Sequence, residues 1–559
     1  MGRARWLIVA VLLGACQGPN APADLVFVDG RVVTLSDVGI AEALAVRGER
    51  IIAIGTSAEI HGWAGPSTRV VQLAGRTMIP GLADNHYHGI GGGPGVDLSR
   101  ARSLGEVLDL IANAAGSMPP GAIVVTNSNW HEGQLAEQRL PYRDDLDEAA
   151  PDHPVVVVRG GHEYILNSAA LEKWDIRESA AEPAGGRIGR YEDGRLNGEL
   201  VDRAKDPVSL PPRASLDAAA SHDALVEEYQ TLHSRGLTSI RYPGASPAQY
   251  ELLQQLKNEG RLSMRVNFLF RAPAAEPLHA LVRAIEAWPD PSEGDAWLGI
   301  GGVKLGVDGG FEGGLMREPY AEPWGVAGSF HGLQTLPTEH FVDVVLMLHR
   351  RGWRVATHAV GDAAIDLVLD AYEVANEERS IEDLRWVIEH GFIPRDDHFA
   401  RMRALGLSVS AQNHLYVAAP SLVSYWGADR AAWTTPLRAY LDADIPISLG
   451  TDSPVIPYDP WWVLHHFTTR GTISAGVLDG SQAISREEAL RAASAGFAHL
   501  TFEESEKGTL EVGKLADLVV TAADVLECAD PCLEAMEVDL TVIGGRVVYD
   551  RGAERTGIR

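Results

Sequence analysis

Two histidines, His86 and His88, follow the apolar run from Met78 to Ala83. Side chains two positions apart on a strand point to the same face. The pair can therefore hold one metal ion from the end of a strand. A single His-x-His is more often a surface or core pair, so a metal site also needs matching groups elsewhere in the chain.

Matching groups follow later predicted strands. Lys304, His358, His390 and Asp452 each lie at or just beyond the end of an apolar run. Imidazole and carboxylate groups that converge at strand ends are ligands for first-row metals, most often zinc. The order and placement of the whole set are far more specific than any one of its members.

Strand and helix patterns alternate through the middle of the chain, as in the helical patterns Glu339–Arg351 and Asp362–Asn376. Together with the strand near Asp84 there are eight predicted strands, the number in a closed (β/α)8 barrel, whose active sites lie at the carboxyl ends of the strands. The other seven are Leu237–Arg241, Met264–Leu269, Gly299–Leu305, Arg354–His358, Arg385–His390, Leu407–Ala411 and Pro446–Leu449.

The two ends of the chain resemble each other. Residues 24–77 and 516–550 are rich in short β-branched runs, and Gly545-Arg546-Val547-Val548 echoes Gly30-Arg31-Val32-Val33. A chain of 559 residues is too long for one core. We expect residues 24–79 and 508–559 to form a small composite β-sandwich, with a TIM-like α/β barrel from 80 to 507 between them.

A long segment separates the first barrel strand from the helix before the second. It contains its own predicted strands, Ile123–Thr126 and Val155–Val158, so we expect an inserted subdomain at about 95–215, near the barrel mouth. Its residues 160–171 are predicted to be a loop that enters a helix.

The N-terminus has the anatomy of an export signal. Arg3 and Arg5 precede a short apolar run, and Leu13-Gly14-Ala15-Cys16 resembles a bacterial lipobox. We expect a signal peptide at 1–15, lipidation of Cys16, and a tether at 16–23. The protein would then be exported and lipid-anchored to the cell envelope, on the periplasmic side of the inner or outer membrane in a Gram-negative source. An ordinary signal peptide or an uncleaved anchor is the alternative.

The net charge of −28 argues against nucleic acid as a partner, because a phosphate backbone requires Lys and Arg. Only Cys528 and Cys532 follow Cys16 in the sequence. In an oxidising compartment these two could form a disulfide, and the sequence leaves this open. It does not support a cysteine-rich metal site.

Six segments carry a resemblance to a known family. The chain resembles the amidohydrolase superfamily of metal-dependent hydrolases, specifically the amidohydrolase-3 or YtcJ-like branch, as a bacterial lipoprotein member. The resemblance spans essentially the whole mature chain and implies a β-sandwich plus a (β/α)8 barrel. The segments are residues 80–88, 303–309, 357–366, 388–390, 449–454 and 508–518.

The resemblance also implies roles for the ligand set. His86 and His88 would bind a first divalent ion with Asp452, and His358 and His390 would bind a second, both ions being zinc. Lys304 would bridge them after CO2 converts its amine to a carbamate, a carboxylated lysine. The alternatives are a structural or substrate-binding lysine, ordinary core histidines, and for Asp452 a helix N-cap.

The function implied is hydrolysis of a non-peptide C–N bond of amide, N-acyl or N-formyl type in a small-molecule substrate. Metal lowers the pKa of bound water to about 7, which supplies a metal-bound hydroxide at neutral pH. Asp452 would be catalytic, taking the proton of the water and passing it to the leaving nitrogen.

Five further residues are weaker candidates for substrate binding: His162, Asn167, Arg241, His414 and Trp130. Two segments depart from the pattern of the branch. Residues 129–131 read Asn-Trp-His where Gly-Trp-Asp is common, and Asn413 replaces a usual Pro. These departures leave the substrate class open.

Two alternative functions remain at this point. The same metal chemistry could act on a cyclic imide, a lactone or an amino-heterocycle. A non-catalytic binding protein could keep the fold, although such a protein should lose ligands and none is missing here. The sequence does not settle the substrate, the native metal, one ion or two, the membrane, or whether the protein is a homo-oligomer.

Overall fold

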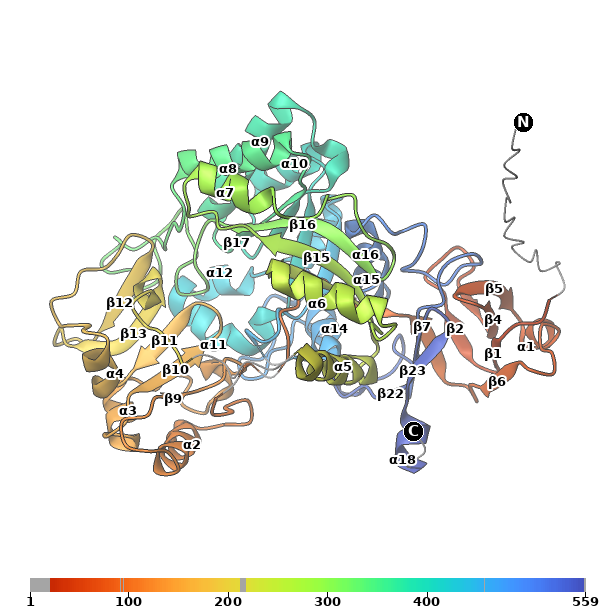
Figure 1. The fold of residues 1–559 in the computed structure, drawn as a ribbon, viewed down its shortest axis with the longest axis horizontal. Coiled ribbons are helices and arrows are strands. Elements are labelled where there is room, and N and C mark those ends of the chain that lie inside the picture. Colours follow the sequence, from red (N-terminus) through yellow and green to blue (C-terminus); the bar gives the residue numbers. More distant parts are fainter. Residues whose placement is uncertain (1–20, 91, 94, 212–217, 457, 557–559) are drawn as a thin grey trace, which may run out of the picture.

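The computed structural model describes residues 21–90, 92–93, 95–211, 218–456 and 458–556 (Figure 1). The predicted signal peptide and the lipidation site Cys16 lie outside the described residues. Within the described residues, none of the helices combines the length and apolar character needed to cross a membrane.

One sheet of eight parallel strands forms the centre of the molecule (Figure 1). The strands neighbour one another in chain order, and the backbone N–H of Asn85 donates to the carbonyl of Leu449 (3.0 Å), which nearly closes the sheet. The predicted barrel fold is confirmed. Its strands are β8 (Leu82–Asp84), β14 (Leu237–Ala245), β15 (Arg265–Arg271), β16 (Leu298–Gly306), β17 (Val355–Ala359), β18 (Val387–His390), β19 (Ser408–Gln412) and β20 (Ile447–Gly450).

Helices surround this sheet and bury one apolar face against it. In α8, Phe341, Val344, Val345 and Leu348 are buried at the spacing of one helix face. The barrel helices are α5 (Ala218–Ser234), α6 (Pro247–Asn258), α7 (Leu278–Ile285), α8 (Thr338–Arg350), α9 (Asp362–Glu378), α10 (Asp396–Ala404), α11 (His414–Trp426), α12 (Ala428–Ala432), α13 (Leu437–Asp442), α14 (Pro460–Thr469), α15 (Arg486–Ala492) and α16 (Ala495–Leu500).

The two chain ends share a pair of sheets at one side of the barrel (Figure 1). Leu25, Val32, Leu518 and Val542 belong to one apolar core, so both ends contribute to it. The four-stranded sheet has β1 (Leu25–Val28), β4 (Ala43–Arg47), β5 (Arg50–Gly55) and β6 (Arg69–Gln72). The six-stranded sheet has β2 (Arg31–Val33), β3 (Ile40–Ala41), β7 (Thr77–Pro80), β21 (Leu518–Thr521), β22 (Val538–Ile543) and β23 (Arg546–Asp550). Short helices α1 (Ser57–His61), α17 (Asp530–Glu534) and α18 (Arg551–Thr556) flank these strands.

The segment between β8 and α5 contains a five-stranded sheet of its own, on the opposite side of the barrel from the sandwich (Figure 1). Its strands are β9 (Val124–Val125), β10 (Val155–Arg159), β11 (Glu163–Leu166), β12 (Gly186–Arg190) and β13 (Leu196–Asp202). Its helices are α2 (Leu104–Gly116), α3 (Arg143–Ala149) and α4 (Ser168–Lys173).

Part of the prediction for residues 160–171 is wrong. Gly160, at φ +56°, is part of a tight turn that returns the chain as β11, antiparallel to β10. Only after β11 does Asn167 cap α4. The predicted loop is limited to the turn at the glycine pair, and the four-residue strand β11 lies between it and the helix. Cys528 and Cys532 are free thiols in the structure.

Candidate metal centre

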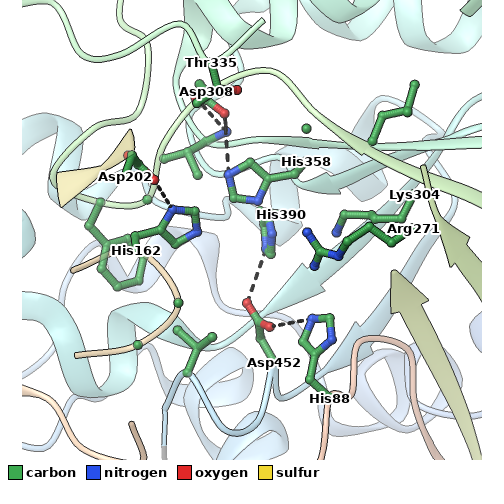
Figure 2. Close-up of a pocket in the computed structure, with 18 of the residues that line it drawn as sticks. His88, His162, Asp202, Arg271, Lys304, Asp308, Thr335, His358, His390 and Asp452 are labelled. Carbon is green, nitrogen blue, oxygen red and sulfur yellow. Dashed lines mark hydrogen bonds and ion pairs between the residues drawn. The ribbon is translucent and has the colours of Figure 1, made fainter. Parts of the chain in front are cut away.

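A cavity of about 840 Å³ opens at the carboxyl ends of the barrel strands. The side chains that line it come from several strands and from the inserted sheet, and Figure 2 shows them pointing inward. All six residues predicted as metal ligands line this one cavity: His86, His88, Lys304, His358, His390 and Asp452.

The segments after β8 and β20 are fixed to each other by backbone hydrogen bonds. The N–H of Asp452 donates to the carbonyl of His86 (2.8 Å), and the N–H of His88 donates to the carbonyl of Ser453 (2.8 Å). A Cβ on Gly450 would lie 2.3 Å from the side-chain oxygen of Asn85, so only glycine permits this close approach. These backbone contacts hold His86 and His88 against Asp452.

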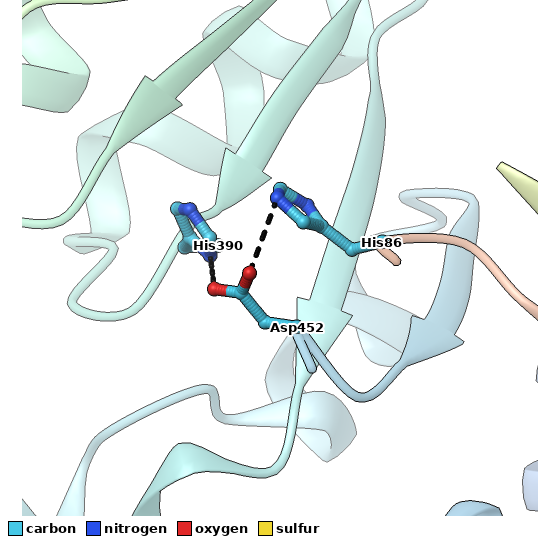
Figure 3. A group of neighbouring side chains, drawn as sticks. All are labelled: His86, His390 and Asp452. Carbon is cyan, nitrogen blue, oxygen red and sulfur yellow. Dashed lines mark ion pairs between the residues drawn. The ribbon is translucent and has the colours of Figure 1, made fainter. Parts of the chain in front are cut away.

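Three side chains form a compact group in the cavity (Figure 3). Ligand atoms of His86, His390 and Asp452 all lie within 4.8 Å of one another. Nε2 of His86 lies 3.6 Å from Oδ1 of Asp452, and Nε2 of His88 lies 3.5 Å from the same oxygen. These separations leave room for an ion between the nitrogen and oxygen atoms.

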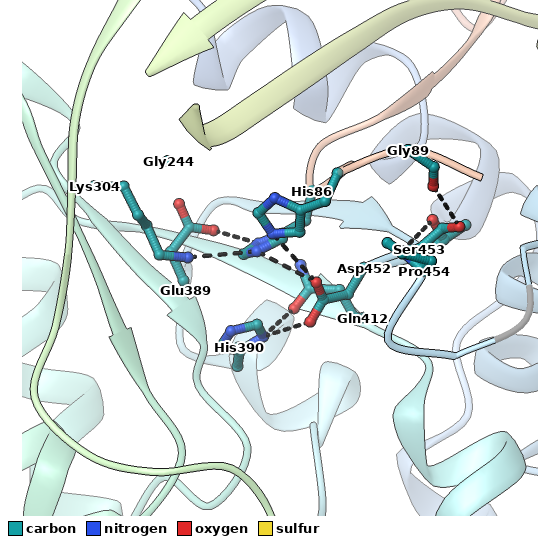
Figure 4. A network of polar contacts seen from close by, with 12 residues as sticks. His86, Gly89, Gly244, Lys304, Glu389, His390, Gln412, Asp452, Ser453 and Pro454 are labelled. Carbon is teal, nitrogen blue, oxygen red and sulfur yellow. Dashed lines mark hydrogen bonds and ion pairs between the residues drawn. The ribbon is translucent and has the colours of Figure 1, made fainter. Parts of the chain in front are cut away.

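Hydrogen bonds made by Nδ1 orient two of the histidines (Figure 4). Nδ1 of His86 donates to Glu389 (2.9 Å), and Nδ1 of His390 donates to the amide oxygen of Gln412 (2.7 Å). Each ring therefore keeps the lone pair on Nε2, the arrangement typical of metal-binding histidine. Arg241 donates to the other oxygen of Glu389 (2.6 Å) and so fixes the carboxylate that orients His86.

Burial sets the charge state of the ligands. It lowers the pKa of His88 to about 3 and holds those of His86, His358 and His390 below the usual value, so all four are neutral at pH 7. Burial alone would raise the pKa of Asp452, but interactions with His86 and His414 outweigh it and hold that pKa well below its usual range. Neutral imidazole and ionised carboxylate are the forms that bind metal.

Two of the predicted ligands adopt a left-handed backbone, which is costly for any residue with a Cβ. The φ angle is +73° at His390 and +59° at Asp452. Such strain persists only where the surroundings impose it, and it gathers at functional sites. It turns both side chains into the cavity immediately beyond their strands.

Lys304 and His358 complete the ring of predicted ligands. Nζ of Lys304 lies 3.4 Å from Nε2 of His86, and burial lowers the pKa of the lysine to about 8. Nε2 of His358 donates to the carbonyl of Gly309 (3.1 Å). The ring centre of His390 lies 4.8 Å from that of His86 and 4.6 Å from that of His358, so His390 lies between them.

Two of the five weaker candidates line the cavity. His414 contacts Oδ2 of Asp452 through Nε2 (3.1 Å). His162 donates from Nδ1 to Asp202 (2.6 Å) and stacks on His358 at a ring distance of 5.4 Å. His414 therefore contacts the proposed proton carrier, and His162 forms the wall beside His358.

The structure places the other three candidates outside the cavity lining. Asn167 caps α4 and donates to the carbonyl of His153, a structural role in the insertion. Trp130 is buried in the core of the insertion and donates from Nε1 to Val158. Arg241 donates to the carboxylate of Glu389 and so positions that carboxylate, outside the cavity lining.

Sequence analysis missed several polar residues around the centre. Glu389 directly precedes His390, and Gln412 lies two residues before His414, so closeness in sequence to predicted site residues was the available signal. The carboxylate of Asp308 accepts the backbone N–H groups of Leu315, Val360 and Gly361 and holds the loops beside His358. Arg271 ends β15 with no motif around it.

The donor set fits a divalent metal ion. Imidazole nitrogens with free lone pairs and a carboxylate oxygen converge in a buried cavity, which is the combination that zinc and its first-row neighbours prefer. The strand ends of the barrel supply the donors, and a layer of hydrogen bonds orients them.

Comparison with known proteins agrees with this geometry. A sequence model described as the amidohydrolase family matches residues 69–549. The chain is 30% identical over 558 residues to an N-substituted formamide deformylase of Arthrobacter pascens, covering 94% of this chain and 98% of the relative. It is 25% identical over 507 residues to YtcJ of Bacillus subtilis (strain 168), covering 88% and 92%.

A solved structure has the same overall fold. A metal-dependent hydrolase from Pyrococcus furiosus aligns with a TM-score of 0.64 at 26% sequence identity. The alignment covers 90% of this chain and all of the other. The similarity thus includes the sandwich and the barrel together.

Proposed function

The chain belongs to the amidohydrolase family and is a metal-dependent hydrolase of C–N bonds, and from that premise we propose that it cleaves a non-peptide amide, N-acyl or N-formyl bond. The convergence of His86, His390 and Asp452 in one cavity carries this proposal. The formamide deformylase relative supports the N-formyl group as one candidate.

The cofactor we propose is a pair of divalent ions, zinc by the chemistry of the donors. His86, His88 and Asp452 would hold one ion, and His358 and His390 the other, with Lys304 between them. When bound, such ions lower the pKa of a coordinated water and polarise a carbonyl oxygen.

Asp452 is the residue that we assign to proton transfer. It is ionised, lies in the cavity, and has more lone pairs than one metal bond uses. It can accept a proton from the attacking water and deliver it to the departing nitrogen, which is a poor leaving group while unprotonated. His414 holds Oδ2 of Asp452, and so directs the other oxygen, Oδ1, toward His86 and His88.

For Lys304 we propose a carbamate formed from its amine and CO2 with release of one proton. The amine is buried beside His86, and an ammonium could not bind a cation. Elemental analysis of active protein should approach two metals per chain. Lys304→Ala should lose metal and activity, with partial rescue by a short carboxylic acid; full activity in this variant would refute the bridge.

A substrate panel tests the bond type. Metal-loaded protein should hydrolyse members of a set of amides, N-acyl and N-formyl compounds. Turnover confined to lactones, cyclic imides or amino-heterocycles would overturn the proposed bond and keep the metal chemistry. Lys304→Ala protein serves as the control for contaminating hydrolases.

The cell envelope is the location that we propose, with a lipid on Cys16. The basic start, the short apolar run and Leu-Gly-Ala-Cys support it. Metabolic labelling with a fatty-acid probe should mark the wild-type protein and not Cys16→Ser. Equal labelling of both would exclude the lipobox.

A further inference from the structure

Arg271 lines the cavity and has no acidic partner in the part of the chain that the structure describes. It is the last residue of β15, and its side chain is exposed to the cavity. Among the described residues it forms one side-chain hydrogen bond, from Nε to the carbonyl of Gly244 (3.0 Å), and no ion pair. The cavity walls lower its pKa, and no acid raises it.

The position of Arg271 follows from strand register. Arg271 on β15 lies opposite Lys304 on β16 in a parallel pair, so both side chains point to the same face. Figure 2 shows the guanidinium beside Lys304, directed into the cavity. The cation therefore lies next to the proposed reaction centre.

Gly244 shapes the space that the guanidinium occupies. A Cβ at this position would lie 3.2 Å from Nη2 of Arg271 and 3.3 Å from Cγ of Lys304. The glycine lets both side chains pack against the same backbone. The carbonyl of Gly244 accepts the hydrogen bond from Nε of Arg271. The two terminal nitrogens of the guanidinium are therefore left to bind a ligand.

The other two arginines that line the cavity each have an acidic partner. Arg159 pairs with Glu312 (2.9 Å) and Arg203 lies 3.5 Å from Asp206. Among the cavity acids, Asp202 pairs with His162. Glu276 follows Arg271 in the same wall, but no ion pair joins the two.

We propose that Arg271 binds a carboxylate of the substrate, which makes the substrate an amide with a carboxylate close to the scissile bond. This rests on the proposed function for the bond that is cut. A guanidinium matches a carboxylate with two parallel hydrogen bonds, a match that a neutral amide substrate cannot make. Because Arg271 neighbours Lys304, the carboxylate is one or two carbons from the amide, as in an N-acyl amino acid.

Matched pairs of compounds test the assignment by binding rather than by turnover. N-formylglycine, N-formylleucine and N-formylphenylalanine, in both enantiomers where they exist, are compared with N-methylformamide, N-isopentylformamide and N-phenethylformamide. Each pair differs only by the carboxylate. Calorimetric titration of metal-loaded Asp452→Asn protein, in which turnover should be slow, should show at least one acid binding between about 10-fold and about 100-fold more tightly than its partner, the range for a hydrogen bond to a charged group.

Two variants of Arg271 and one control, each made in the Asp452→Asn protein, locate the effect. Arg271→Met should abolish the preference for the acid, and Arg271→Lys should restore part of it with poorer geometry. Arg203→Met, a change at the paired cavity arginine, should keep the preference. Circular dichroism and metal content accompany each variant.

The assignment and the proposed function can fail separately. Equal affinity within every pair, or no binding of any acid, overturns the role of Arg271 even when loaded enzyme hydrolyses neutral amides. A preference abolished by Arg271→Met supports the role even when the bond cut is not an amide. Loss of metal in Arg271→Met with no change in preference overturns it, because Arg271 would then support Lys304 instead.

Discussion

Among the described residues, two groups bring histidine and aspartate together closely enough to hold a metal ion. One is His86, His390 and Asp452 in the barrel cavity, and the other is Asp366, Asp397 and His398 on the outer helices α9 and α10. In the outer group Arg317 donates to Asp366 and Asp397, at 2.6 Å and 2.7 Å, and its Nη2 lies 2.8 Å from Nε2 of His398. The guanidinium of Arg317 therefore already occupies the position that a metal ion would take in this group.

The inner group is different because its neighbouring cation can lose its charge. Lys304 lies 3.4 Å from His86, but burial lowers its pKa to about 8, whereas a guanidinium remains charged. The inner histidines are also oriented from behind by Glu389 and Gln412. Clustered ligands therefore indicate a metal site only where no permanent cation fills it and a second layer orients the donors.

Asp452→Asn should have the largest effect. The amide keeps the shape and one coordinating oxygen, so the fold and most of the metal should be retained. It cannot accept a proton, and kcat should fall by about 100-fold or more, the usual loss for a general acid–base. Steady-state kinetics with metal analysis of the same samples measures both.

A leaving-group series serves as the control for Asp452→Asn. Substrates with better leaving groups should lose less, because they depend less on protonation of the nitrogen. If the variant hydrolyses amides at the wild-type rate while His86→Ala and His390→Ala are inactive, the proton carrier is another residue, and His414 is the next candidate.

Glu389→Gln tests the orienting layer. The variant replaces the charged acceptor that fixes His86 by a neutral amide and breaks the ion pair with Arg241, so metal affinity should fall by about 10-fold to about 100-fold. Competition with a chelator measures the affinity. Asp397→Asn in the outer group is the matched control, and any change in metal content there would show that the outer group also binds metal.

His414→Gln should have a smaller effect on catalysis. His414 contacts the oxygen of Asp452 that faces away from the histidine pair, so its loss frees the carboxylate to rotate. We expect kcat to fall by about 10-fold, at the lower end for an orienting partner, with metal content unchanged. A loss as large as that of Asp452→Asn would instead place His414 in the proton transfer itself.

The sequence predicted the parts of the inner group that follow a simple rule. Strand alternation gives the barrel, and positions at strand ends give His86, His390 and Asp452 as predicted ligands. It could not reveal the partners of those ligands. Glu389 reaches His86 across the barrel, 303 residues apart in sequence, and only the closed sheet brings them together.

The position of Asn167 outside the cavity lining and the lack of any sequence signal for Arg271 have the same physical explanation. Asn167 was considered for substrate binding because of a local motif, yet its amide caps a helix and joins loops of the insertion. Arg271 has no motif around it, because its role depends on register with β16 and on the absence of a nearby acid. Both properties belong to the folded chain and not to neighbouring residues.

Arg317→Gln should have the smallest effect, confined to stability. Hydrogen bonds from Arg317 lower the pKa of Asp397 to about 2 from its usual 3.8, and they outweigh burial at Asp366 to lower its pKa as well. Because their folded pKa values lie below the unfolded ones, both carboxylates stabilise the fold above about pH 3.8, and this stabilisation is lost as pH falls toward 2. Asp397 is largely exposed, so the contribution is about 1 kcal/mol or less.

The urea midpoints of wild type and variant should differ at pH 7, converge between pH 4 and pH 2, and differ less in high salt. Activity and metal content should not change, because α9 and α10 hold this group away from the cavity lining; lower metal content in Arg317→Gln would contradict the distinction between the two groups.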